Sequence, residues 1–428
     1  MRPKIYSVGK YATLIAIRTD RFKSESFGVR FAVPISALTS QRYCVALHLL
    51  RRGTERFTTK AAFDRRMDDL YASSIVAGTK KLGDMQVFEF LADFLGARYV
   101  GGGLGIITEV LQMMSELLYR PYLPGGCFHL PYLEAEKIVL RDAIRSEINA
   151  PRSYARSRCA SLLMAGEPHA LCLSGELDTV DALDASDLTC LWQEAMQVLT
   201  PVFTYVGSTP PEELIPLLER YFKTGSNPFE YLQPDNRMPA APLRQVQDMP
   251  IAQGRLVVGY RTDIFPGDRL YPALTVAETI YGGSAASKLF LNVREKRSLC
   301  YYCSSRYLST KGALVAEAGI RPDHAAIAEE AIKGEMQALC RGEISETELA
   351  AAKSYMDHSF QKLYDSPTAL ASYYSRLYMT GRVEDVEDAR AAVKAVTRED
   401  VTEAAAHFCE GAVFYLNGTS GMEEGEDE

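Results

Sequence analysis

The chain has 428 residues, of which 47% are apolar and 24% charged, a composition typical of globular proteins that bury sizeable cores. This length is too great for one ordinary core and predicts two or more domains. The net charge is −8, to which the run EEGEDE at the C-terminus contributes five negative charges, so there is no basic excess of the kind that accompanies nucleic-acid binding.

The sequence also indicates where the protein works. The N-terminal stretch MRPKIYSVGK lacks the apolar segment of a secretory signal, and no apolar run approaches the ~18–20 residues that cross a bilayer. The nine cysteines are scattered, as expected of reduced thiols. We therefore predict a cytoplasmic protein that binds neither membrane nor nucleic acid. Cys300 and Cys303 form a C-x-x-C pair without a second pair to complete a zinc set, so ordinary cysteines are expected there, with a redox or metal pair as the alternative.

The N-terminal part of the chain predicts strands and a helix. The runs LIAIRTDRF (14–22), SFGVRFAVPI (26–35) and DMQVFEFLADF (84–94) are rich in β-branched and aromatic residues and indicate strands. The segment TTKAAFDRRMDDLYAS (58–73) indicates a helix, because its apolar residues recur at i, i+4, i+7 and i+8 after a threonine N-cap.

Two short echoes indicate that the chain is a duplication. LIAIRTDRF (14–22) is repeated by LVVGYRTDIF (256–265), so that Arg-Thr-Asp follows an apolar run in both places. The runs VFTYVG (202–207) and VFYLNG (413–418) are both β-rich and end in glycine. Because both echoes occur in the same order, they argue for two related halves that open and close on strands, with mostly helix between.

The remaining segments complete the predicted organisation. Residues 224–250 are rich in proline and polar residues, which is the composition of a linker. In the second half, a helix is expected to end at Gly342, and the capping box Ser345-Glu-Thr-Glu348 opens another that runs to about Tyr364. The acidic tail is expected to be disordered because its charges repel and it has little to bury.

These elements predict an α+β fold with two homologous layered domains, each a mainly antiparallel sheet packed with helices. The predicted boundaries are an N-terminal domain of residues 1–223, a linker of 224–250, a C-terminal domain of 251–418 and an acidic tail of 419–428.

The stretch YCVALHLLRRGTERF (43–57) resembles, in altered form, the signature of the pitrilysin/insulinase family of zinc peptidases. That signature is H-x-x-E-H on a helix, a few residues before a K-G-T-like turn. With Arg52-Gly53-Thr54 on the turn, Cys44 replaces the first histidine, Leu47 replaces the general-base glutamate, and only His48 remains. Leucine cannot take a proton from zinc-bound water, so the resemblance implies a degenerate metal site.

The family's third zinc ligand is a glutamate on a later helix. The run EKIVLRDAI (136–144) places Ala143 there, or Asp142 if the match slips by one residue. A catalytic zinc needs three protein ligands and an open position for water, whereas Cys44 and His48 supply two. We therefore expect no metal bound by this chain and a packed or solvent-edge His48. The alternative is an independent peptidase that holds zinc through Cys44, His48 and Asp142 with an unidentified base.

The run YGGSAASKLFLNVREKRSLCYY (281–302) resembles the C-terminal signature of the same family: a glycine-serine turn, a helix of SKLF-x-x-V-R-E-K type and a strand with tyrosine. In that family an arginine, and a tyrosine seven residues later, contact the substrate near the scissile bond. Arg294 and Tyr301 fall on these positions, and their donors suit a peptide carbonyl that becomes an oxyanion. The alternative is that Arg294 pairs with an acid such as Glu295 and Tyr301 packs in the core.

Family members with a broken metal motif and an intact arginine–tyrosine pair occur in two-subunit peptidases, such as mitochondrial processing peptidase and paired bacterial peptidases. The resemblance therefore implies that this chain is not an enzyme on its own but the non-catalytic, substrate-binding subunit of a heterodimeric zinc endopeptidase. The implied partners are a homologous H-x-x-E-H subunit that holds the zinc and a peptide substrate, while a homodimer of the isolated chain stays open. The alternative is a purely structural homologue, like the core subunits of a respiratory complex that resemble this family.

Overall fold

The computed structural model describes residues 2–101, 103–233, 237–238 and 241–419, which form two compact units. Of the described residues, unit 1 takes those within Met1–Arg145, Leu171–Leu232 and Lys362–Asp385. Unit 2 takes those within Ser146–Ala170, Gln233–Gln361 and Val386–Glu428. Each unit therefore includes a segment from the other half of the chain.

Unit 1 is built on a mixed six-stranded sheet. Its strands are β1 (Lys4–Val8), β2 (Ala12–Arg18), β3 (Ser24–Pro34), β4 (Ser74–Leu82), β5 (Met85–Leu95) and β6 (Val202–Gly207). They lie in the order β1-β2-β6-β3-β5-β4, with β2 and β6 parallel and all other neighbours antiparallel. Its helices are α1 (Ser40–Leu50), α2 (Lys60–Asp69), α3 (Gly105–Tyr119), α4 (Leu130–Ser146), α6 (Ala185–Val198), α7 (Pro211–Tyr221) and α11 (Pro367–Met379).

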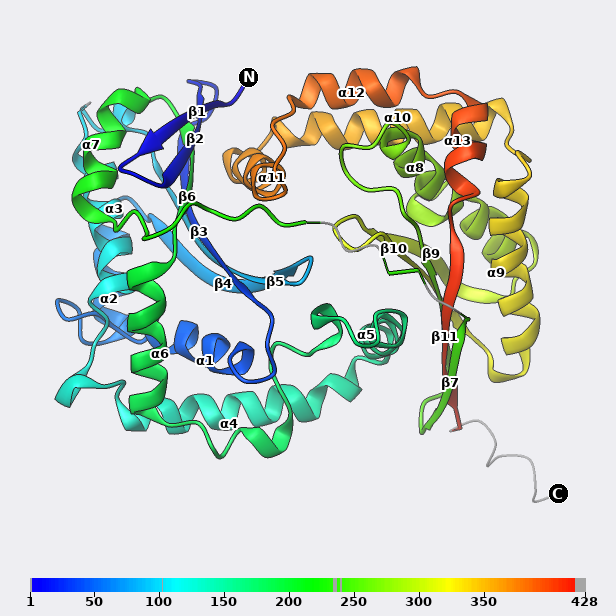
Figure 1. Cartoon of the computed structure of the whole chain (residues 1–428), viewed down its shortest axis with the longest axis horizontal. Helices are drawn as coiled ribbons and strands as arrows, with labels where there is room; N and C mark the ends of the chain where they lie inside the picture. Colours follow the sequence, from blue (N-terminus) through cyan, green and yellow to red (C-terminus); the bar gives the residue numbers. More distant parts are fainter. Residues whose placement is uncertain (1, 102, 234–236, 239–240, 420–428) are drawn as a thin grey trace. The chain divides into compact units, whose positions relative to one another are not determined.

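Alternation along β3 explains the layers of unit 1. Phe27, Val29 and Phe31 are buried in a core shared with α1, α3 and α6, whereas Arg30 points to the opposite face of the sheet. There Arg30 Nη2 donates to Ser372 Oγ of α11 at 3.4 Å. Figure 1 shows α3 and α11 on opposite faces of this sheet.

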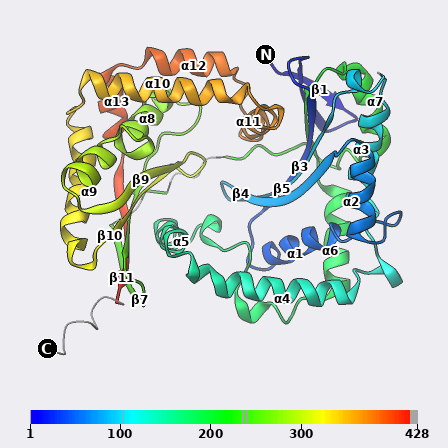
Figure 2. The same ribbon diagram turned by 180° about the vertical axis from the view of Figure 1, so that it is seen from behind.

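Unit 2 is built on a five-stranded sheet. Its strands are β7 (Leu243–Met249), β8 (Gly254–Arg261), β9 (Cys300–Leu308), β10 (Ala313–Ile320) and β11 (Cys409–Gly418). They lie in the order β7-β11-β8-β10-β9, with β7 and β11 parallel and the rest antiparallel. Its helices are α5 (Pro151–Leu163), α8 (Tyr271–Glu278), α9 (Ala325–Cys340), α10 (Glu346–Leu363), α12 (Val386–Ala395) and α13 (Arg398–Ala405), with π-helical turns η6 (Thr279–Gly283) and η7 (Leu289–Lys296). Figure 2 shows α5 and α9 on opposite faces of this sheet.

The two sheets have the same topology, which confirms the predicted α+β fold of two homologous layered domains. Omitting β1, the order β2-β6-β3-β5-β4 corresponds strand for strand to β7-β11-β8-β10-β9, including the parallel first pair. The echo of 202–207 in 413–418 joins equivalent strands, β6 and β11. The Arg-Thr-Asp echo does not, because Arg18 ends β2 whereas Arg261 ends β8, whose counterpart is β3. The prediction that the two Arg-Thr-Asp segments are equivalent was therefore wrong.

Local sequence signals correspond closely to the observed helix starts. Thr59 caps α2 by accepting a hydrogen bond from the Ala62 backbone N–H. The capping box before α10 is present, since Ser345 and Glu348 exchange side-chain and backbone hydrogen bonds. The segment predicted as a linker contains β7, and most of the predicted acidic tail, 420–428, lies outside the described residues. Within the described part of the chain, every helix is too short or too polar to span a bilayer.

Candidate functional site

Helix α1 carries the three positions aligned with the metal motif, Cys44, Leu47 and His48, and it buries the first two. Leu47 is 1% exposed and belongs to the core of unit 1. Cys44 is buried on the same side, where its thiol donates to the Leu173 carbonyl at 3.3 Å and accepts from Gln86 Nε2 at 3.4 Å. Burial raises the pKa of the Cys44 thiol to about 12, so it stays protonated at neutral pH and is a poor metal ligand.

His48 lies on the exposed side of α1, beside a glutamate of α4. Its Nδ1 is 3.5 Å from Glu136 Oε2, and its side chain is 54% exposed. Arg52 Nε donates to the other oxygen of Glu136 at 2.8 Å. Hydrogen bonds from His48 and then from Arg52 hold the pKa of the Glu136 carboxyl below its usual range. The carboxylate is therefore ionised and already engaged by a guanidinium.

These donors do not fit a catalytic zinc. Within the described residues, no group of three or more His, Cys, Asp and Glu is placed to hold a metal ion. Asp142, the candidate third ligand, is exposed and lies about 9 Å further along α4 than Glu136, at 1.5 Å per residue. The acid that meets His48 is Glu136, which sequence reasoning missed although it begins the quoted run EKIVLRDAI.

The second predicted site lies in unit 2, where η7 leads into β9. Arg294 is near the end of η7, a π-helical turn, which is a rare form often found at functional sites. Its guanidinium lies 4.5 Å from the centre of the Phe290 ring, and its Nη1 is 3.1 Å from Glu295 Oε1. Its Nε donates to the backbone oxygen of Tyr301 at 3.0 Å. The arginine is thus tied directly to the backbone of its predicted partner.

Tyr301 is displaced outward by a β-bulge. In the pairing with β10, Ile320 faces Cys300 and Gly319 faces Tyr302, so Tyr301 is the additional residue. Bulges re-aim side chains and are common beside active sites. Tyr301 is consequently 54% exposed on β9, an edge strand of its sheet.

The bulge also accounts for the C-x-x-C pair. One extra residue between them lets Cys300 and Cys303 make contact, and a hydrogen bond from Cys303, helped by the charge of Arg294, lowers the pKa of Cys300. Both thiols are free in the structure.

The alternative interpretation, in which Arg294 pairs with an acid and Tyr301 packs in the core, agrees with the structure in its first part only. The contact between Arg294 and Glu295 that it predicted is present. Its other half, a core position for Tyr301, is wrong because the bulge directs this side chain outward. What the arrangement offers chemically is a guanidinium tied to the Tyr301 backbone and an exposed phenol on the edge strand, both able to donate to a peptide carbonyl.

A second acid near this site escaped the sequence analysis. Glu278 ends α8, and its Oε1 accepts from Ser305 Oγ of β9 at 2.8 Å. Burial raises the pKa of this carboxyl to about 7. The glycine-serine turn permits the close packing, since a Cβ on Gly283 would lie 2.6 Å from Glu278 Oε2. The only feature of the sequence that pointed to this close packing was the Gly282-Gly283 pair.

Two repeated α+β units and a metal motif without its donors are the features of an inactive metallopeptidase-like protein. Residues 182–356 match the family described as "Peptidase M16 inactive domain". The chain is also 29% identical over 409 residues, 95% of each protein, to "Probable inactive metalloprotease YmfF" of Bacillus subtilis. By these matches the chain is similar to the inactive members of the peptidase M16 family and to a probable inactive metalloprotease. The resemblance to the pitrilysin/insulinase peptidases is thereby confirmed.

Solved structures share the fold over nearly the whole chain. A conserved protein from Enterococcus faecalis V583 superimposes with a TM-score of 0.90 at 22% identity, over 98% of this chain and 99% of that one. A chain of "Complex III2 from Candida albicans, Inz-5 bound" superimposes with a TM-score of 0.74 at 16% identity, over 97% of this chain and 95% of that one. Chains of this fold thus occur in multi-chain assemblies.

Proposed function

We propose that this chain is the non-catalytic, substrate-binding subunit of a heterodimeric zinc peptidase that cleaves peptides. A homologous H-x-x-E-H subunit supplies the zinc and the general base, and this chain supplies Arg294 and Tyr301. Both subunits work in the cytoplasm, in keeping with nine cysteines that are all free in the structure.

The observation that carries this proposal is the geometry of the arginine–tyrosine pair. A bulge exposes Tyr301 at a sheet edge, and the Arg294 side chain is tethered to its backbone oxygen at 3.0 Å. A residue with only a packing role would not need this outward displacement. The positions aligned with the metal motif, unlike this pair, offer no accessible donors, because Leu47 packs in the core and Cys44 is a buried thiol. One site has been lost to packing while the other keeps exposed donors.

The test is to mix the purified chain with its cognate H-x-x-E-H homologue and to measure peptide turnover. Each chain alone should be inactive and the mixture active. Arg294→Ala should lower kcat by roughly 10²-fold, the usual effect of removing one donor to an oxyanion, and Tyr301→Phe should also lower it. Arg306→Ala, an exposed arginine on the same strand, is the matched control and should leave kcat unchanged.

A second candidate is a scaffold without a role in proteolysis. The contact of Arg294 with Glu295 and the fold shared with a complex III chain favour it. Full activity of the mixture with Arg294→Ala and Tyr301→Phe would overturn the substrate-binding role of the pair and favour the scaffold. Stoichiometric zinc and peptidase activity in the isolated chain would overturn both.

A further inference from the structure

A polar cavity in unit 1, remote in sequence from Arg294 and Tyr301, has the features of a ligand site. It lies where the loop after α1 meets the C-terminal end of α3. Within the loop, Thr54 N–H donates to the Phe57 carbonyl at 2.7 Å. Glu55 N–H donates to the Arg120 carbonyl at 3.0 Å and fastens the loop to the end of α3. Thr54 is fully buried, so the loop has a fixed base. The walls of the cavity are therefore held in place.

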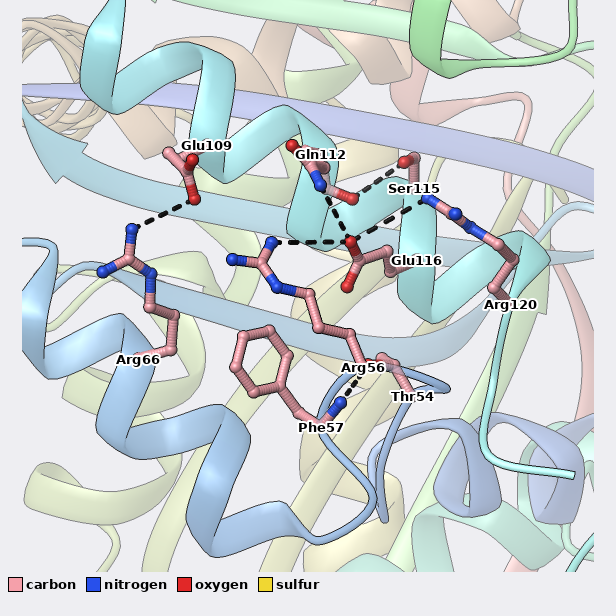
Figure 3. A network of polar contacts seen from close by, with 9 residues as sticks. All are labelled: Thr54, Arg56, Phe57, Arg66, Glu109, Gln112, Ser115, Glu116 and Arg120. Carbon is pink, nitrogen blue, oxygen red and sulfur yellow. Dashed lines mark hydrogen bonds and ion pairs between the residues drawn. The ribbon is translucent and has the colours of Figure 1, made fainter. Parts of the chain in front are cut away.

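The cavity has a volume of about 550 Å³, within the range typical of small-molecule sites. Every residue that lines it is charged or an amide: Glu55, Arg56, Glu109, Gln112, Glu116 and Arg120. Figure 3 shows the side chains of Arg56 and Arg120 converging on Glu116 from two sides, while Gln112 reaches it along α3.

Glu116 is the unusual member of this group. Its side chain is 4% exposed, and its Oε1 accepts one hydrogen bond, from Gln112 Nε2 at 3.0 Å. The nearest guanidinium nitrogens of Arg56 and Arg120 are 3.7 and 3.8 Å from Oε1, too far for hydrogen bonds. Its Oε2 is buried with no hydrogen-bond partner among the described residues. Buried carboxylates are rarely left in this state, because an unmade hydrogen bond there is costly.

The other charges in the cavity leave room for an anionic group. Glu109 is already paired with Arg66, whose Nη2 is 3.2 Å from its Oε2. Arg56 and Arg120 are 44% and 54% exposed, and neither hydrogen bonds to Glu116. Their forked donors suit a carboxylate. A cation-accepting group and two carboxylate-binding groups thus lie about 4 Å apart in one cavity.

We propose that this cavity binds a free α-amino acid. The ligand's ammonium donates to the Glu116 carboxylate, which lines the cavity, and its carboxylate accepts from Arg56 and Arg120. Only a compact zwitterion fits the close spacing, because the two termini of a peptide separate by ~3.3–3.6 Å with each added residue. The side chain of the amino acid takes up the rest of the cavity. This site is independent of Arg294 and Tyr301, so the proposal does not rest on the proposed function.

Isothermal titration of the full-length chain with L-alanine tests the proposal. Saturable binding is expected in the millimolar range or tighter. N-acetyl-alanine, which lacks the ammonium, and alaninamide, which lacks the carboxylate, should each bind at least ~10-fold more weakly, as for the loss of a charge-assisted hydrogen bond. Glu116→Gln and the exposed-site variant Arg56→Gln should weaken L-alanine binding by a similar factor. Arg65→Gln, exposed on α2 beside Arg66, should not.

Three results would overturn the proposal. The first is no heat of binding with L-alanine at any soluble concentration. The second is equal binding of alaninamide or N-acetyl-alanine, which would mean a site for a lone anion or a lone cation. The third is unchanged affinity in a folded Arg56→Gln variant, whose fold is checked by circular dichroism.

Discussion

At the scale of single residues, the former metal positions show how a site is lost while its helix remains. Leu47 has a new role in the core of unit 1, and Cys44 is held as a neutral thiol. His48 keeps its place but meets a glutamate that Arg52 already engages. Restoring a zinc site would therefore require more than one substitution, because Leu47 packs in the core and Cys44 is buried and hydrogen-bonded.

Glu278, the partly buried acid next to β9, makes stability depend on pH. The folded pKa of Glu278 is about 7, against about 4.5 in the unfolded chain. Since the unfolded state releases this proton first, stability should fall as pH rises from about 4.5 to about 7. Glu278→Gln removes this effect and keeps the acceptor for Ser305. It should raise the free energy of unfolding at pH 8 by on the order of 2 kcal/mol, and by nothing at pH 4.5.

Urea unfolding of both proteins at the two pH values measures this difference. Glu295→Gln, which changes an exposed acid on η7, is the control. An equal shift at pH 4.5 and pH 8 would mean that burial of the carboxyl is not the cause.

The sequence predicted those parts of the site that depend on one continuous segment, and it missed those that depend on contacts between segments. The spacing of Arg294 and Tyr301 could be recognised in the sequence because it is a property of one continuous segment. The bulge that exposes Tyr301 could not, since it depends on pairing with β10. Glu136 and Glu278 were missed for the same reason: each acquires its meaning from a partner on another element, His48 in one case and Ser305 in the other.

At the scale of elements, each sheet presents a buried arginine to the helix that covers its second face. Arg30 on β3 is opposite Val202, the first residue of β6, and Arg261 on β8 is opposite Cys409, the first residue of β11. Both arginines are 1% exposed, and both have acid partners, Glu89 and Glu167. Equivalent strands thus carry equivalent buried charges, a repeat that is visible only after the sheets are matched.

The arginine of unit 1 should be costly to remove alone. Arg30→Met would remove one of the two 2.8 Å partners of Glu89, leaving Lys80, and would remove the contact to Ser372 of α11. We expect a loss of about 3–5 kcal/mol in the free energy of unfolding, as for one member of a buried ion pair. The double variant Arg30→Met, Glu89→Met should lose less than the sum of the two single variants, because the pair is coupled. Strictly additive losses in urea unfolding would contradict this.

At the scale of the whole molecule, the predicted fold class was correct, but the prediction did not say which helix packs on which sheet. Strands and helices were recognised because their periodicity is local. The membership of α5 and α11 was not recognised, since sequence indicates that a helix exists and not which sheet it covers. The predicted domains 1–223 and 251–418 describe halves of the chain, whereas α5 packs on the sheet of unit 2 and α11 on that of unit 1.

The exchange of helices predicts how fragments of the chain behave. Residues 1–232 alone lack α11, so the face of the sheet around Arg30 would be bare. We expect this fragment to unfold without a cooperative transition and to bind a hydrophobic dye. Joining residues 362–385 to its end through a glycine-serine linker should restore cooperative unfolding, whereas a scrambled version of 362–385 should not. Cooperative unfolding of 1–232 by itself would show that α11 is dispensable.

The exchange of α5 and α11 between the two units also determines when each unit can fold during synthesis on the ribosome. The sheet of unit 1 is fully translated by Gly207, yet its covering helix emerges only with Pro367–Met379. The helix α5, made early, has to wait for a sheet that is finished by β11 near the C-terminus. Neither unit can mature before most of the polypeptide exists, so a prematurely stopped product contains no finished half and becomes a client for chaperones or proteases.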